Sequence, residues 1–440
     1  MKKPFALLFL GCLIINVFGC AKQEKTAAAP AAKPQIVVWH WMTDREDAFL
    51  ELARRYEKIT GVKVKLELYA PSESYSTKVK AAAQTNTLPD VYSVLGESRD
   101  FASFIKAGLI ENLTRYMDEN NNAWRGKLFA KALAMSEMVE GNEFQVQPGT
   151  YGVPIDCTNI QFLYNKDLFK QAGLDPENPP KTWPEFIEAG KKLKAAGIAG
   201  VVSGWGETWM INSLADDFAW NIMGREKIIK TIKGEVKYTD PDWVKVFTLF
   251  KEMRDAEMLA PGIVTMVNKI AEQNFANQRA AIAFNGSWCV NVYYHMNPDL
   301  NYAAMLPPMI SENYPCVIWG GAGSSFMVNA RSSRKQQAIA FLKWLTDKEQ
   351  QAYLAKETRN LPANKDSLGS IPPILAQFAD DMDNIIHPRF LPVSERPLVT
   401  EAIAKGIQSI IIKEKTPKEV AEDVQRSKNE EIASVHNLNG

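Results

Sequence analysis

Residue types that could perform covalent chemistry are sparse in this chain of 440 residues and show no catalytic spacing. The four histidines do not lie at the spacing of metal ligands, and the P-loop, GxGxxG, GxSxG and HExxH patterns are absent from the sequence. A glycosidase needs only two facing carboxylates, so that class stays open. The most conspicuous acidic pair, Asp216 and Asp217, consists of neighbours in an expected helix that do not face one another, and a solvated helix face is the better interpretation. The residues themselves therefore predict no metal site, no cofactor and no catalytic centre.

Tryptophan is the more informative residue type. The chain contains eleven tryptophans, and several lie beside glycine and short polar side chains. Four segments share this composition: 38–41 (VWHW), 204–209 (GWGETW), 285–288 (NGSW) and 319–325 (WGGAGSS). Aromatic rings cover the apolar faces of a sugar, glycine lets the backbone approach a ligand, and Asn, Asp, Glu and Ser side chains bind hydroxyl groups. The four segments together favour a binding site for a sugar-like molecule.

The elements that must position these segments alternate between strand and helix patterns. In order, we expect a strand at 36–41, a helix at 49–59 ended by Gly61, a strand at 62–68, a helix at 75–85 and a strand at 90–95. This order predicts an α/β fold with a largely parallel sheet, in which ligands bind outside the carboxyl ends of the strands. Further helices are expected within 240–258 and, from capping patterns, after Thr182, Thr346 and Thr416.

The N-terminus has the pattern of a lipoprotein export signal. Two lysines precede an apolar stretch at 5–18 that is too short for a spanning helix, and Gly19 precedes Cys20. We expect a signal peptide at 1–19, a lipidated Cys20 and a flexible tether at 20–35. An ordinary signal peptide cleaved nearby is the alternative. The expected location is the cell envelope outside the cytoplasm, with the lipid anchor as the one membrane attachment.

Composition excludes some classes of partner. Lys plus Arg and Asp plus Glu both number 51, so the formal net charge is zero, and no basic cluster suggests nucleic-acid binding. Beyond the signal, the cysteines are Cys157, Cys289 and Cys316, without CxxC spacing. A disulfide between Cys289 and Cys316 is conceivable in an exported protein, but three free buried thiols are favoured.

Several stretches, taken together in order and spacing, resemble a known family. They are 88–92 (LPDVY) with 107–110 (AGLI), 151–154 (YGVP) through 163–166 (LYNK), 285–288 (NGSW), and 320–330 followed by 340–346 (AFLKWLT). They are similar to the extracellular solute-binding proteins of ATP-driven importers, specifically the sugar-binding group that includes maltose-binding protein. The resemblance covers nearly the whole mature chain.

The resemblance implies the two-lobed periplasmic-binding-protein fold of type II, an α/β fold whose lobes are joined by crossing hinge segments. The crossings are expected near 154–158, 319–325 and 361–364. Lobe 1 would comprise 36–154 plus 325–361, and lobe 2 would comprise 157–319 plus 366–440. The ligand would lie between the lobes.

The resemblance also implies which residues contact the ligand. Trp288 stands out, because the aromatic residue of the NGSW motif stacks on sugar in this family. The full set of expected ligand contacts is Trp41, Glu97, Asp156, Thr158, Trp205, Glu207, Trp209, Trp288, Trp319, Gly320 and Gly321.

The function implied is that of a monomeric, lipid-anchored binding protein. It would capture a sugar, either a mono- or oligosaccharide or a related polyol, and deliver it to the permease of an ABC transporter. Two alternatives remain open: an exported carbohydrate-active enzyme, and a binder of polyamines or other cations with the same fold, because cations also use tryptophan together with carboxylates.

Overall fold

The first strands and helices form as the hydrophobic patterns predict. The structure is a computed structural model that describes residues 34–439 except 97 and 381. Strand β1 (Gln35–His40) pairs in parallel with β2 (Lys63–Leu68) and with β3 (Val91–Tyr92), as predicted for these first strands. The prediction of a largely parallel sheet is wrong for the sheet as a whole, because the two long strands that come later in the chain pair antiparallel with most of their neighbours. Helix α1 (Glu46–Thr60) joins β1 to β2 and ends at Gly61, whose φ of 73° lies in the left-handed region that glycine tolerates. The predicted signal peptide, Cys20 and Glu97 lie outside the described residues.

Strand β3 is shorter than the predicted strand at 90–95. Its neighbour Asp90 accepts hydrogen bonds from the backbone N–H of Val37 at 2.8 Å and from the hydroxyl of Ser332 at 2.5 Å. These bonds tie the segment to β1 and to the chain after the last long strand, so Asp90 has a structural role.

A 10-stranded sheet runs through the molecule in the order β2-β1-β3-β10-β6-β8-β7, with β9, β11 and β12 attached beside it. A separate pair is formed by β4 and β5. The remaining strands are β4 (Glu137–Met138), β5 (Gly149–Thr150), β6 (Val153–Asn165), β7 (Val201–Val202), β8 (Ile282–Gly286), β9 (Tyr302–Met305), β10 (Ile318–Val328), β11 (Leu361–Pro362) and β12 (Ile385–Ile386).

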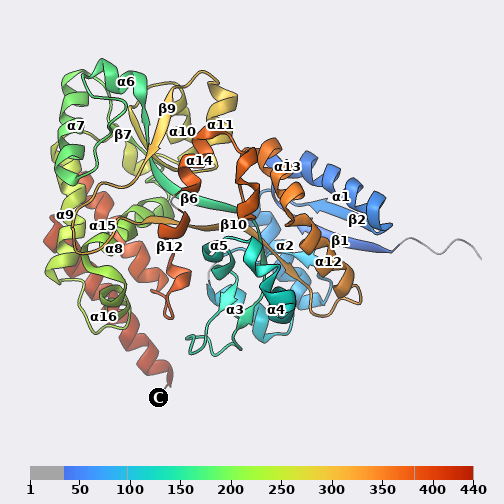
Figure 1. Cartoon of the computed structure of the whole chain (residues 1–440). Helices are drawn as coiled ribbons and strands as arrows, with labels where there is room; N and C mark the ends of the chain where they lie inside the picture. The colour runs from blue at the N-terminus through green and yellow to red at the C-terminus, as the bar shows by residue number, and fades with distance from the viewer. Residues whose placement is uncertain (1–33, 97, 381, 440) are drawn as a thin grey trace, which may run out of the picture.

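The helices surround this sheet in two bodies (Figure 1). They are α2 (Ser72–Thr85), α3 (Ser98–Lys106), α4 (Thr114–Asn122), α5 (Ala130–Ala134), α6 (Lys166–Gln171), α7 (Trp183–Ala195), α8 (Thr208–Ile232), α9 (Pro241–Asp255), α10 (Asn268–Ala276), α11 (Cys289–Met296), α12 (Lys335–Leu345), α13 (Lys348–Thr358), α14 (Pro373–Ala379), α15 (Pro397–Ile411) and α16 (Pro417–Asn439). We call the body with β1, β2, α1 to α5, α12 and α13 the first lobe. The body with α6 to α11, α15 and α16 is the second lobe.

Two long strands connect the lobes. Strand β6 has 13 residues and β10 has 11, and they pair antiparallel from Trp319 opposite Ile160 to Phe326 opposite Val153. Figure 1 shows both strands passing from one lobe to the other. Each lobe also has an apolar core of its own. One core combines residues within 160–305 with residues within 399–424, and the other combines residues within 39–151 with Met327.

The capping patterns were right for two helices and wrong for one. Thr182 and Glu185 form the expected capping box of α7, and Thr416 and Glu419 exchange hydrogen bonds ahead of α16. Thr346 instead ends α12 and donates its hydroxyl to the carbonyl oxygen of Leu342, so Asp347 becomes the N-cap of α13. The local pattern could not show that Thr346 is completely buried beneath Trp124, whose indole donates to it at 2.9 Å.

The three cysteines of the folded part are free thiols, as favoured from the sequence. Cys157 and Cys289 are buried, and Cys316 is half-buried.

Candidate functional site

Three neighbouring strands bring the glycine and tryptophan segments together. Trp319 on β10 lies opposite Ile160 on β6, and Ile160 lies opposite Gly286 on β8. Because neighbouring strands are about 4.8 Å apart, the backbones of Trp319 and Gly286 are roughly 10 Å apart. Thr158 lies within the same region, with its hydroxyl oxygen 3.2 Å from that of Ser287. The pairing therefore places segments 285–288 and 319–321 beside the first crossing.

The ring of Trp288 is held in one orientation. It lies over the backbone of Gly286, where an added Cβ would come within 1.9 Å of the ring, so the position requires glycine. The indole Nε1–H of Trp288 donates to Oε1 of Glu272 at 3.1 Å. The same carboxylate oxygen accepts from the side chains of Asn268 at 2.9 Å and Asn285 at 3.3 Å. Glu272 is nearly buried, and this burial raises its pKa.

A second tryptophan and carboxylate lie beside the first pair. The ring centroid of Trp209 is 6.0 Å from that of Trp288, and the Trp209 side chain is 42% exposed. Its indole donates to Oε2 of Glu207 at 2.9 Å, and Oε1 of Glu207 accepts from the backbone N–H of Asn268 at 2.8 Å. We call Glu207, Trp209, Glu272 and Trp288 the aromatic half-site. It offers partly exposed rings beside carboxylates, which suits the apolar faces and hydroxyl groups of a sugar.

Trp319 lies near the Asp216–Asp217 pair, and this changes the interpretation of those acids. Asp217 is 1% exposed and Asp216 is half-buried, so the prediction of a solvated helix face is wrong. Burial raises the pKa of Asp216 to about 7, and a hydrogen bond from the Trp319 side chain opposes the rise. The ring of Trp319 also contacts His387, with ring centroids 4.2 Å apart. The indole of Trp319 therefore contacts both an acidic residue of α8 and an imidazole.

The two glycines after Trp319 permit close packing at the crossing. A Cβ on Gly320 would lie 2.7 Å from the carbonyl oxygen of Thr158. A Cβ on Gly321 would lie 2.7 Å from the side chain of Met135, which follows α5 of the first lobe. Gly320 and Gly321 thus bring the second crossing strand close to both the first crossing and the first lobe.

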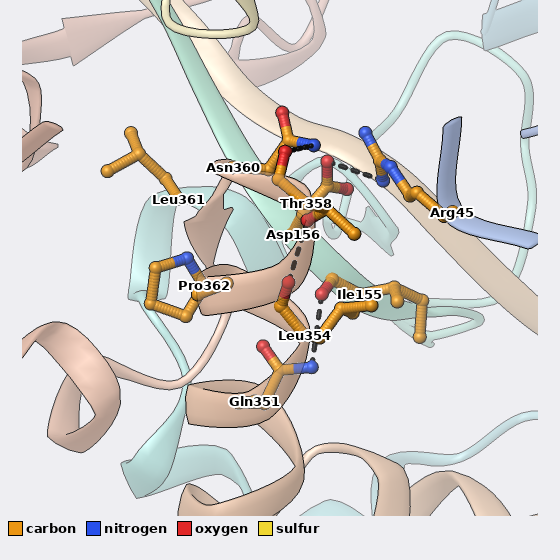
Figure 2. Close-up of a pocket in the computed structure, with 10 residues that line it drawn as sticks. Arg45, Ile155, Asp156, Gln351, Leu354, Thr358, Asn360, Leu361 and Pro362 are labelled. Carbon is orange, nitrogen blue, oxygen red and sulfur yellow. Dashed lines mark hydrogen bonds and ion pairs between the residues drawn. The ribbon is translucent and has the colours of Figure 1, made fainter. Parts of the chain in front are cut away.

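Asp156 is committed to a buried ion pair at the crossing (Figure 2). Its Oδ2 lies 2.7 Å from Nη1 of Arg45, and its Oδ1 accepts from the hydroxyl of Ser324 at 2.5 Å. Asp156 is 3% exposed, and burial raises its pKa while the charge of Arg45 acts in the opposite direction. The gap beside these residues has no room for a water molecule. The geometry supports a role in joining the crossing strands rather than the expected ligand contact.

Two of the other expected contacts, Trp41 and Trp205, lie in different environments. Trp41 follows the carboxyl end of β1 in the first lobe, is half-buried, and packs against Tyr75 with centroids 5.1 Å apart. Trp205 has no exposed surface and packs against Phe250 in the core of the second lobe, which does not fit a ligand contact. Glu97 cannot be placed, because it lies outside the described residues.

Sequence reasoning missed Glu272 and Arg45. Glu272 lies in an ordinary amphipathic helix, α10, where an acid usually faces solvent, and Arg45 lies in a polar segment after β1. No local pattern marks either residue, because their partners Trp288 and Asp156 are brought to them by the tertiary fold.

Neither a metal site nor a membrane-spanning helix is found in the part of the chain that the structure describes. Within these ranges, no group of three or more His, Cys, Asp or Glu side chains is placed to hold a metal ion. Over the same residues, no helix combines the length and the apolar character needed to cross a membrane.

The two lobes, the crossing strands and the aromatic half-site define a protein built to bind a small molecule. A model of the bacterial extracellular solute-binding protein family matches residues 41–352. The chain belongs to this family, whose members bind solutes and are not enzymes. The expected α/β fold and the family resemblance are confirmed.

Individual relatives agree with this assignment. An uncharacterized ABC transporter extracellular-binding protein of Pyrococcus horikoshii is 24% identical over 436 residues, which cover 95% of this chain and 93% of that protein. A multiple sugar-binding protein of Streptococcus mutans is 22% identical over 355 residues, which cover 78% of each. The solved structure of a chitin oligosaccharide binding protein superposes with a TM-score of 0.72 at 22% identity, covering 90% of this chain and 98% of that one. The last similarity shows a shared fold.

Proposed function

We propose that this protein captures a sugar or a related polyol outside the cytoplasm and delivers it to the permease of an ABC transporter. The observation that carries the proposal is the aromatic half-site, in which two partly exposed tryptophan rings lie 6.0 Å apart with a carboxylate bonded to each indole. The names of the Pyrococcus and Streptococcus relatives support the transporter and the sugar, respectively.

The proposed binding mode uses both lobes. The sugar body stacks on Trp209 and Trp288, and its hydroxyl groups reach Thr158 and the carboxylates. Trp41 closes on it from the first lobe. The proposed lobe boundaries are 36–154 plus 325–361 and 157–319 plus 366–440, with the ligand at their junction. A ligand bound between the two lobes favours the closed state of the protein. A permease can then distinguish the closed, occupied protein from the open, empty one.

A thermal-shift screen followed by titration calorimetry tests the ligand class. Sugars, polyols, polyamines and amino acids are compared, and a ligand present at 100 times its Kd stabilises the protein by about 2.7 kcal/mol. We expect saturable binding by a sugar or polyol whose mass is unchanged after incubation. Conversion of an oligosaccharide to products would support the enzyme alternative, and binding by polyamines alone would support the cation alternative.

The proposed lipid anchor is tested separately from binding. Cys20→Ser removes the thiol that receives the lipid, so the variant should leave the detergent phase and lose the lipid mass while it still binds solute. If the variant keeps its lipid mass and stays in the membrane fraction, the anchor is at another residue or absent.

A further inference from the structure

A cavity of about 190 Å³ lies between elements of the first lobe and segment 389–394. Its first-lobe wall comes from α3, α5 and β4 with the segment after β4, and its other wall is segment 389–394, which leads into α15 of the second lobe. Met135 lines the cavity and also packs against Gly321, which pairs with Thr158. The cavity therefore adjoins the second crossing strand at Gly321, opposite Thr158 of the first crossing. Its volume far exceeds the roughly 10–15 Å³ that one water needs.

Two cations line this cavity without an ion-pair partner among the described residues. Arg389 is half-buried and donates to the carbonyl oxygen of Gly96, a neutral group. Burial lowers the pKa of Arg389, and no acidic group acts against it. Lys131 lies with its Nζ 5.3 Å from the ring centroid of Phe390. A cation withdrawn from water with neutral neighbours is costly, so both groups gain from an anionic partner.

The acids of the cavity do not supply that partner. Glu137 is engaged by the guanidinium of Arg125 and by the hydroxyl of Thr150. Glu143 accepts a hydrogen bond from the backbone N–H of Ser394 at 3.0 Å. The cavity thus holds two cations without carboxylate partners and one acid without a cation. The aromatic half-site has the opposite character, because Glu207 and Glu272 receive hydrogen bonds there from indole, amide and backbone N–H groups.

We propose that the solute carries an oxyanion, a phosphate or a carboxylate, and that Arg389 and Lys131 bind this group in the cavity while the sugar or polyol body lies on the aromatic half-site. A guanidinium presents paired N–H donors that match both oxyanions, and charge-assisted hydrogen bonds are the strong ones. Lys131 belongs to α5 and Arg389 to the segment before α15, so the oxyanion also draws the two lobes together. This inference rests on the proposed function for the body of the solute.

Matched ligands test the proposal by titration calorimetry on the purified full chain. The series compares glucose with glucose 6-phosphate and glucuronate, and glycerol with glycerol 3-phosphate. We expect an acidic member to bind at least tenfold more tightly than its neutral counterpart. Comparison of the phosphate compounds with glucuronate shows whether the preferred oxyanion is a phosphate or a carboxylate. Arg389→Gln should remove the preference and its salt dependence. Arg279→Gln, at an exposed arginine that does not line the cavity, should leave both unchanged. Neutral members that bind as tightly as the acidic ones would overturn the inference.

Inorganic phosphate separates this inference from the proposed function. At matched ionic strength, phosphate should raise the Tm of the wild-type protein and of Arg279→Gln, but not that of Arg389→Gln. If neutral sugars bind and phosphate has no effect, the anion site is wrong and the sugar site stands. If phosphate acts through Arg389 while no sugar or polyol compound binds, the sugar body is wrong and the anion site stands. If neither has any effect, both proposals fail.

Discussion

At the scale of single residues, the orientation of Trp288 is the most constrained feature of the proposed site. The Gly286 backbone supports its ring, and the Glu272 carboxylate accepts from its indole at 3.1 Å. Because the Trp288 side chain is already held in one rotamer before the ligand arrives, little side-chain conformational entropy is lost on binding. Glu272 is a positioning residue in this arrangement.

Trp288→Ala should weaken solute binding by about tenfold to 150-fold, which corresponds to roughly 1.4–3 kcal/mol for an aromatic binding residue. The Tm of the unliganded protein should change much less than the affinity, because the Trp288 ring is only half-buried. Titration calorimetry and thermal unfolding measure the two effects. Trp205→Leu is the matched control, because it removes a fully buried ring. This variant should lower the Tm clearly and change the affinity for the solute little. Unchanged affinity in Trp288→Ala would make Trp288 a packing residue.

Asp216→Asn should stabilise the unliganded protein at pH 8 but not at pH 4. The ordinary pKa of the Asp216 carboxyl is 3.8, and burial raises it to about 7 in the fold. The folded state therefore holds a proton that the unfolded chain releases, and stability falls as the pH rises from about 4 to about 7. Asparagine resembles the protonated acid, so the variant avoids this loss. We expect a Tm gain on the order of 1–3 °C at pH 8. Asp299→Asn, at an exposed acid, controls for the change of residue type. An equal gain at both pH values would contradict the shifted pKa.

At the scale of elements, the connection between lobes depends on the pairing of β6 with β10. The pairing contains irregularities in register between Ala322 and Ser324 and between Ser324 and Ser325. At this point Ser324 donates to Asp156, while Arg45 lies within hydrogen-bond distance of both. The ion pair between Arg45, which precedes α1, and Asp156 thus stabilises the crossing at the point where the β6–β10 pairing is irregular.

Arg45→Met should destabilise the protein by about 3–5 kcal/mol, because Asp156 would keep a buried charge without its cation. Adding Asp156→Asn should restore part of the loss, since an amide tolerates burial better than a carboxylate. Urea unfolding of the unliganded variants measures both effects. Arg55→Met breaks an exposed pair with Glu51 and should cost about 1 kcal/mol or less. Similar losses in Arg45→Met and Arg55→Met would show that the buried pair contributes no more than a surface pair.

At the scale of the whole molecule, segment 389–394 adds side-chain contacts across the junction to those made by the crossing strands. Arg389 reaches the carbonyl oxygen of Gly96, Ser394 reaches Glu143, and Phe390 lies beneath Lys131. These contacts join the approach to α15 with the first lobe. A ligand that touches both lobes binds the closed state more tightly and shifts the balance towards closure.

Small-angle scattering should show a smaller radius of gyration when the solute is saturating than when it is absent. Tryptophan fluorescence should change over the same concentration range, because Trp209 and Trp288 become covered together. The Trp288→Ala variant, measured at a solute concentration too low to saturate it, should retain the larger radius of gyration. An unchanged scattering profile at saturation demonstrated by calorimetry would favour a rigid site on one lobe.

The sequence by itself predicted those features that depend on neighbours along the chain. Gly61 ends α1, the Thr182–Glu185 capping box begins α7, and alternation of apolar residues produced β2, which pairs in parallel with β1. Backbone propensity, capping and hydrophobic period act over a few residues, so they can be read directly. Together with the family resemblance, they were sufficient to predict the α/β class and the two-lobed fold.

The tertiary structure alone decided which polar and aromatic side chains lose contact with water. Asp217 and Trp205 are buried although their local patterns suggested a solvated face and a ligand contact, respectively. Glu272 and Asp156 owe their roles to Trp288 and Arg45, which lie 16 and 111 positions away along the chain. Burial and partner choice depend on which distant segments pack together, and here the chain crosses between the lobes more than once. The pKa values and the charge balance of the cavity follow from that packing, because desolvation and ion pairing act through space and not along the sequence.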